Sequence, residues 1–267
     1  MSLWSADPLH IALAPGEVAL LGGGDSRLLA TEARNTASLL PLLDEALTDA
    51  AWPRRRVEVT LSQQFVRQVL TPPPGKALAR AEEAALVAAS LREIYGSEAA
   101  GWRVAVHSQP PHAGLVGAAV DGDFLQQLEA LLARHGCRNV TITPLASRAV
   151  QRLPARFDGW WIGVEPGWAT LMGASGGIWQ HVAAQPLDAN WRAALPEWLA
   201  LEAECAAAPI VHQAWLQPFG LGAIGSRAVG AVAVDSAVVN PATTDDWRWH
   251  TLPHDAQARG ATALVGI

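Results

Sequence analysis

One twelve-residue pattern occurs twice in this chain. "IALAPGEVALLG" at residues 11–22 and "IGVEPGWATLMG" at residues 162–173 align without a gap at an offset of 151 residues. Each copy has two apolar runs separated by Pro-Gly, which is typical of two strands joined by a tight turn. A chain that contains the same hairpin twice is expected to have two halves built on one plan.

The residues around each hairpin support two halves of mixed α/β class. In the first half, alternating and helical periodicities predict further strands at 27–31, 56–62, 65–71, 102–108, 113–121 and 139–145, and helices at 35–50, 76–95 and 122–135. The second half restarts at Asp158 with strands at 159–165, 167–173 and 177–185, a helix at about 190–207 and a strand at 210–216. We expect a first lobe at 1–155 and a second, shorter lobe at 156–267.

Composition narrows the functional class. The net charge of −6 and the pI near 5.7 argue against a nucleic-acid-binding surface. The N-terminus "MSLWSADPLH" has neither the basic nor the apolar region of a signal peptide, and no apolar run reaches the about 20 residues of a membrane span. The sequence therefore predicts a cytoplasmic protein.

The duplicated hairpin resembles the actin-like ATPase fold, in which a ribonuclease-H-like unit occurs twice. In active members each hairpin turn is an Asp-x-Gly phosphate loop, where glycine admits the phosphate and the carboxylate positions Mg²⁺ or water. Here the turns read Ala14-Pro15-Gly16 and Glu165-Pro166-Gly167. The first lacks the carboxylate, and each proline removes a backbone N–H. We expect a degenerate nucleotide site without cofactor, metal or catalytic residue.

Five further segments carry a closer resemblance, to the cytoplasmic actin-like domain of type II secretion protein L and to type IV pilus protein M. It covers residues 10–190 and rests on "VTLSQQFVRQVLTPPP" (59–74), "ALVAASLREIYG" (85–96), "GWRVAV" (101–106), "GAAVDGDFLQQLEALLARHGCRNVTITPLASRAV" (117–150) and "GWWIGVEPGWATLMGASGGIWQHVAAQPL" (159–187). The resemblance does not separate the pilus system from the secretion system.

This resemblance implies a non-catalytic scaffold of an inner-membrane assembly platform. Its expected partners are the cytoplasmic tail of a bitopic membrane protein and the secretion or pilus ATPase, and a homodimer is possible. The chain would then lie at the inner membrane through its partners. The alternative is an ATP-binding kinase or ATPase with diverged phosphate loops, which would use Glu165 and the glycines.

Tryptophan is unusually frequent, with twelve residues, and four of them are candidates for partner binding. Trp160 and Trp161 are neighbours on a predicted strand, so their side chains must point to opposite faces. One is expected in the core, and the other is outside unless a helix covers it. Trp247 and Trp249 would share a face of an extended segment.

Three other motifs point to different chemistry, and their contexts argue against it. "GLGAIG" at 220–225 fits a dinucleotide loop but is followed by a strand-like segment. Ser175 in "GASGG" fits a nucleophile elbow, which needs a following helix, yet the next residues alternate as in a strand. His250 and His254 have a metal-ligand spacing, but Pro253 disfavours the helix that would align them.

Overall fold

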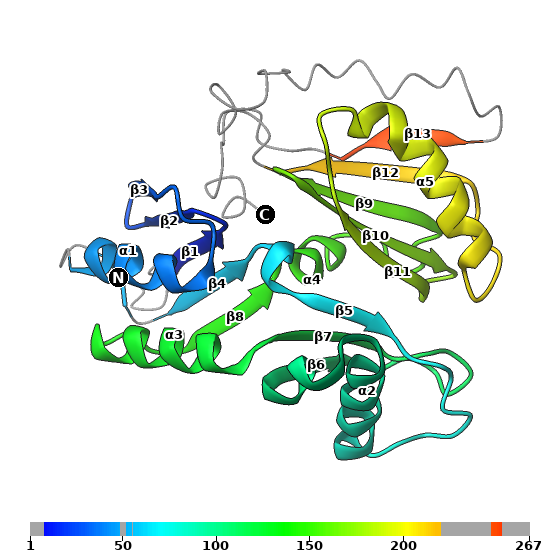
Figure 1. The fold of residues 1–267 in the computed structure, drawn as a ribbon, viewed down its shortest axis with the longest axis horizontal. Coiled ribbons are helices and arrows are strands. Elements are labelled where there is room, and N and C mark those ends of the chain that lie inside the picture. Colours follow the sequence, from blue (N-terminus) through cyan, green and yellow to red (C-terminus); the bar gives the residue numbers. More distant parts are fainter. Residues whose placement is uncertain (1–7, 49–51, 55, 220–246, 253–267) are drawn as a thin grey trace, which may run out of the picture.

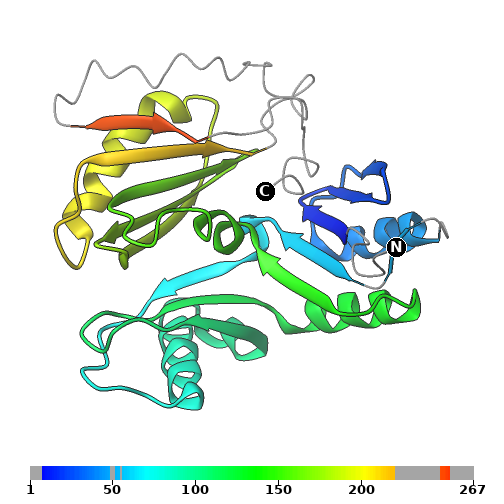
Figure 2. The ribbon, with the colours of Figure 1, turned by 180° about the vertical axis from the view of Figure 1, so that it is seen from behind.

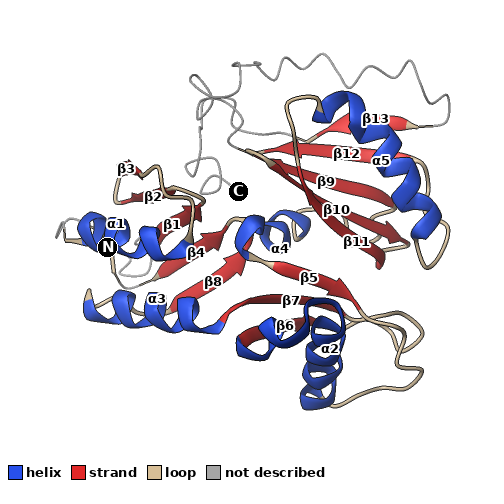
Figure 3. Ribbon diagram, in the orientation of Figure 1, coloured by secondary structure: helices blue, strands red, loops and turns tan. Residues whose placement is uncertain are grey.

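The computed structural model describes residues 8–48, 52–54, 56–219 and 247–252. Within these ranges the chain forms two five-stranded sheets and one three-stranded sheet, with helices on their faces (Figure 1). Figure 3 shows that helices and strands intermingle along the chain. The mixed α/β class predicted from the sequence is confirmed.

The first hairpin lies inside a five-stranded sheet. Its strands are β1 (Leu9–Ala14), β2 (Glu17–Gly22), β3 (Asp25–Ala30), β4 (Val57–Leu61) and β8 (Val140–Pro144). The order is β3-β2-β1-β4-β8. The strands β3, β2 and β1 form an antiparallel meander, whereas β4 and β8 continue parallel to β1.

The second hairpin lies at the same place in a second sheet. Its strands are β9 (Gly159–Glu165), β10 (Trp168–Ser175), β11 (Ile178–Pro186), β12 (Gln213–Pro218) and β13 (Arg248–Thr251). The order β11-β10-β9-β12-β13, with an antiparallel meander followed by two parallel strands, repeats the first sheet strand for strand. The duplication predicted from twelve residues therefore extends to the topology of both halves.

Each large sheet buries one face under helices. Helices α1 (Thr36–Leu47) and α3 (Gly122–Arg134) cover the first sheet, and α5 (Trp191–Cys205) covers the second. Asn35 begins α1 as the sequence predicts, since its Oδ1 accepts a hydrogen bond from the Ser38 amide at 2.9 Å. Because side chains alternate along β1, Leu9, Ile11 and Leu13 face these helices and are fully buried.

The other faces of the two sheets meet in a second apolar cluster, here called the interlobe cluster. Its buried members are Ala12, Ala19, Val116, Leu145, Ala146, Ala149, Phe157, Trp161, Met172, Ala174, Trp179 and Phe219. The short helix α4 (Leu145–Val150) contributes three of these residues and lies between the lobes, as the view from behind shows (Figure 2). The lobe boundary expected at residue 155 falls in the segment between α4 and β9.

A third sheet projects from the first half. It consists of β5 (Arg67–Leu70), β6 (Trp102–His107) and β7 (Val116–Asp121) in the order β5-β7-β6, with α2 (Arg80–Tyr95) packed on it. Two short 3-10 helices, η1 (Gln63–Phe65) and η2 (Gly96–Gly101), lead into β5 and β6. The sequence predicts these strands, but it does not predict that they form a separate sheet.

Candidate functional site

The two Pro-Gly turns have the same backbone conformation. Gly16 has φ +82° and Gly167 has φ +79°, and each follows a proline. Proline at the second position and a positive φ at the third are the requirements of a type II turn, which explains why both copies carry Pro-Gly. Each glycine carbonyl then accepts a hydrogen bond from the chain after the third strand of its meander, from Thr31 N at 2.8 Å and from Leu187 N at 3.0 Å.

The first turn offers no charged side chain at its first position. Ala14 is partly buried and packs against the interlobe cluster. Pro15 has no N–H to give to a phosphate. The backbone of Gly16 lies close to Thr31, since a Cβ built on it would be 2.7 Å from the Thr31 carbonyl oxygen.

The carboxylate of the second turn is committed to a contact between the lobes. Glu165 is only 3% exposed, and its Oε1 accepts a hydrogen bond from the backbone N–H of Gln63 in η1 at 2.9 Å. The Ser62 side chain also hydrogen-bonds the Glu165 carboxyl. Beside them, Gln64 Nε2 donates to the carbonyl of Pro166 at 3.1 Å. The turn is thus held against the residues that follow β4.

Burial raises the pKa of Glu165 to about 7, while the hydrogen bonds from Ser62 and Gln63 act in the opposite direction. Glu165 is therefore a carboxyl that titrates near neutral pH inside the protein.

Within the residues that the structure describes, no group of three or more His, Cys, Asp or Glu side chains is arranged to hold a metal ion.

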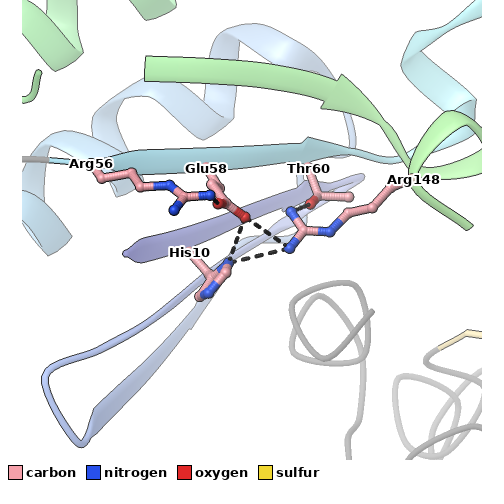
Figure 4. A network of polar contacts seen from close by, with 5 residues as sticks. All are labelled: His10, Arg56, Glu58, Thr60 and Arg148. Atoms are coloured by element: carbon pink, nitrogen blue, oxygen red, sulfur yellow. Dashed lines mark hydrogen bonds and ion pairs between the residues drawn. The ribbon is translucent and has the colours of Figure 1, made fainter. Parts of the chain in front are cut away.

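The inner face of the first sheet carries a polar network beside this region (Figure 4). Arg148 of α4 donates to Glu58 Oε2 at 3.0 Å and to Thr60 Oγ1 at 3.2 Å. Glu58 also pairs with Arg56 at 2.6 Å and with His10 at 3.4 Å. Because Glu58 and Thr60 belong to β4, the network attaches α4 to the first sheet.

The structure separates the four candidate tryptophans. Trp160 and Trp161 have no exposed surface: Trp160 packs with the residues under α5, and Trp161 lies in the interlobe cluster. Neither can contact a partner in this arrangement, which corrects their assignment to a docking patch. Both faces of β9 are covered, so the strand has no outer side. Trp247 is also buried and stacks on His212 at 4.6 Å between ring centroids, and only Trp249 is half-buried.

The other motifs are placed by the structure as follows. Ser175 ends β10 and leads through Gly176 and Gly177 directly into β11, so it lies in a hairpin turn and not before a helix. His250 is exposed on β13 and stacks on Trp215. The segment 220–225 and His254 lie outside the described residues.

Sequence reasoning missed a groove between the first sheet and the third. It has a volume of about 300 Å³ and opens between β8, β6 and the side of α3. Its lining comes mainly from apolar side chains, among them Leu61, Val104, Ala118, Val120, Leu125 and Ile142. Arg103 and Glu129 form an ion pair of 2.7 Å at the same groove. The sequence predicts the strands β6 and β8, but it does not predict which sheet each of them joins.

Both strands beside this groove, called the edge groove below, are sheet edges among the described residues. The Asn139 carbonyl accepts from Val57 of β4, so in a parallel ladder the amide groups of Val140 and Ile142 point to the open side. An edge with free amide groups can pair with an additional extended strand. The edge groove therefore combines apolar lining with hydrogen-bonding capacity.

No protein-family model and no curated protein matches this sequence. Solved structures match in fold. An actin-like ATPase-fold protein of unknown function from Bacteroides thetaiotaomicron has a TM-score of 0.57 at 10% identity, over 97% of this chain and 95% of the other. The cytoplasmic domain of EpsL, an inner-membrane component of the Vibrio cholerae type II secretion system, gives 0.52 at 14% identity, over 97% and 92%. A PilM–PilN type IV pilus biogenesis complex gives 0.55 at 13% identity, over 79% and 81%.

None of the described helices is both long and apolar enough to cross a bilayer. The identities to these solved structures are low, but two of the three matches each cover 97% of this chain. The chain contains two sheets of identical topology, each with its Pro-Gly hairpin at the lobe interface. Together with the structural matches, this duplication shows that the chain has the actin-like ATPase fold.

Proposed function

We propose that this protein is a non-catalytic scaffold in the inner-membrane assembly platform of a type IV pilus or type II secretion system. It would bind the cytoplasmic tail of a bitopic membrane protein. The fold neighbours support this proposal, since they include a cytoplasmic domain of such a platform and a pilus biogenesis complex. Through that tail the chain would lie peripherally at the inner membrane.

The edge groove is the observation that carries the binding role. A tail in extended conformation could pair with the free edge of β8 through Val140 and Ile142. Its register would end at Pro144, which has no N–H. A cavity of about 300 Å³ with apolar walls would take one large aliphatic or aromatic side chain of the tail.

The non-catalytic character rests on the two turns. Ala14 has no carboxylate to position a metal or water, and the Glu165 carboxyl accepts hydrogen bonds from the other lobe. Pro15 and Pro166 each remove an N–H from the loop that would hold phosphate. The turns therefore keep the glycine of the Asp-x-Gly pattern without the groups that would hold a phosphate and a metal. The proposal extends to a secretion or pilus ATPase as the second partner.

A cavity-filling variant tests the binding role. Ala118 lines the edge groove, and Ala118→Leu would fill part of it. Ala85→Leu adds the same atoms on the exposed side of α2 and is the matched control. Each tagged protein is incubated with detergent-solubilised membranes, and bound proteins are identified by mass spectrometry.

We expect the wild type and Ala85→Leu to retain the same single-span membrane protein. Ala118→Leu should retain less of it, by a factor of about ten or more, because the large side chain of the tail loses its apolar pocket. Equal recovery by both variants would show that the tail binds elsewhere. Recovery of neither a single-span protein nor a hexameric ATPase by the wild type would count against the scaffold itself.

A further inference from the structure

The contact between the two lobes at Glu165 has its donors in one lobe and its acceptors in the other. Gln63 N and the Ser62 hydroxyl donate to the Glu165 carboxyl, and Gln64 Nε2 donates to the Pro166 carbonyl. Ser62 Oγ accepts from Gln64 N at 3.2 Å, which leaves its own hydrogen for Glu165. Three consecutive residues of the first lobe thus hold one turn of the second.

Both sides of this contact are fixed within their own lobe. The Ser62 amide donates to Leu13 at the end of β1 at 2.9 Å, and the Gln63 Oε1 accepts from Ala146 of α4 at 3.2 Å. Glu165 is the last residue of β9, and it pairs with Trp168, the first residue of β10. If the lobes move apart, the Glu165 carboxyl must therefore leave its donors and enter water.

We propose that Glu165 is a proton-controlled latch between the lobes: its neutral carboxyl keeps the second lobe closed on η1, and loss of the proton releases it. This device goes beyond the scaffold role and does not depend on it. It uses the position where active members of the fold carry a phosphate-loop carboxylate. In this chain the side chain itself joins the two lobes.

The charges on the surrounding elements leave Glu165 without a counter-ion among the described residues. Arg67, at the start of β5, donates to the carbonyls of Gln64 and Val66. Arg148 of α4 pairs with Glu58. Glu17, at the first turn, is the other nearly buried carboxylate of the interlobe side, with 6% exposure. In the described part of the chain, only burial and the bonds from Ser62 and Gln63 shift the pKa of Glu165.

The size of the effect follows from the two proton affinities. The pKa of Glu165 is about 7 in the closed form, against 4.5 for the same carboxyl in water. The closed form therefore holds the proton over a range in which the open form has lost it. Between pH 5 and pH 8 this difference raises the equilibrium constant for opening by about 70-fold.

Hydrogen exchange of single amides measures this opening in the full-length protein. The Gln63 amide donates across the lobes, whereas the adjacent Ser62 amide donates within the first lobe. After correction for the intrinsic rate, we expect the protection of Gln63 to fall by about 70-fold from pH 5 to pH 8. The protection of Ser62 should change far less.

Two variants separate ionisation of Glu165 from other effects of pH. Glu165→Gln keeps the acceptor oxygen but cannot ionise, and should give Gln63 the same protection at pH 5 and pH 8. Glu93→Gln removes an exposed carboxylate of α2 and should keep the wild-type profile. A parallel fall of Gln63 and Ser62, or the same fall in Glu165→Gln, would overturn the latch. If Glu165→Gln does not fold, the carboxyl carbon of wild-type Glu165 is followed by NMR, and titration below pH 5 would likewise overturn it.

Discussion

The side chain of Gln109 pairs with the backbone of Trp179 as a neighbouring strand would. Its Oε1 accepts from Trp179 N at 2.7 Å, and its Nε2 donates to Trp179 O at 3.1 Å and to Gly114 O at 2.6 Å. Gln109 lies in the loop between β6 and β7, and Trp179 lies on β11 of the second lobe. One amide side chain therefore joins the third sheet to the second lobe.

Removing this amide should destabilise the protein. In Gln109→Ala both backbone groups of the nearly buried Trp179 lose their partner, and we expect the free energy of unfolding in urea to fall by about 2 kcal/mol. Gln127→Ala, on the exposed side of α3, is the control and should stay within about 0.5 kcal/mol of the wild type. Equal stability of the two variants would mean that the Gln109 contact contributes nothing.

Nucleotide should not stabilise the protein. A ligand at 100 times its Kd adds about 2.7 kcal/mol to the free energy of unfolding, or about 5–10 °C in Tm for a chain of this size. With ATP and Mg²⁺ we expect no shift in a thermal melt, because the first turn has no carboxylate and the Glu165 carboxyl of the second is bonded to Gln63.

The variant Ala14→Asp restores a carboxylate to the first turn and sharpens this test. It should also show no shift, since Pro15 and Pro166 still lack their N–H groups and Glu165 remains bonded to Gln63. A clear rise in Tm with ATP in the wild type would favour the alternative of an ATP-binding enzyme with diverged loops.

The local parts of this structure could be predicted from the sequence. The Pro-Gly turns and the Asn35 cap act over two to four residues, so the residues themselves specify them. The long-range pairings could not be predicted in the same way. β4 and β5 are separated by five residues but belong to different sheets, which depends on β8 and β7 far along the chain.

The candidate site shows the same division. Ala14 and Glu165 were identified from their turns, but one donor to Glu165 is the amide of Gln63, 102 residues away, and no periodicity connects the two residues. In α2 the sequence predicts a helix, but the structure decides which face is covered: Ala81 and Ala85 are exposed, whereas Val87 and Leu91 are buried. Small alanines fit either face of a helix, so the position of the third sheet decides which face is covered.

Stability should depend on pH through Glu165. Its pKa is raised from 4.5 to about 7 in the folded protein, so the unfolded chain releases the proton first as pH rises. The contribution of Glu165 is fully present below pH 4.5 and is lost as pH rises through 7, by about 3 kcal/mol in all. Urea unfolding at several pH values measures it. Glu165→Gln should remove this fall, and an unchanged slope in that variant would assign it to other groups.

The two glycine turns should respond differently to the same substitution. Gly167→Ala places a Cβ in open space and has only the cost of φ +79°, about 1 kcal/mol of unfolding free energy. Gly16→Ala has the same backbone cost at φ +82°, and its Cβ would lie 2.7 Å from the Thr31 carbonyl oxygen, which must move and strain its hydrogen-bonded segment. We expect Gly16→Ala to lose at least about 1 kcal/mol more than Gly167→Ala in urea unfolding. Equal losses would show that the first turn relaxes freely, and that the meander after it is not fixed against Gly16.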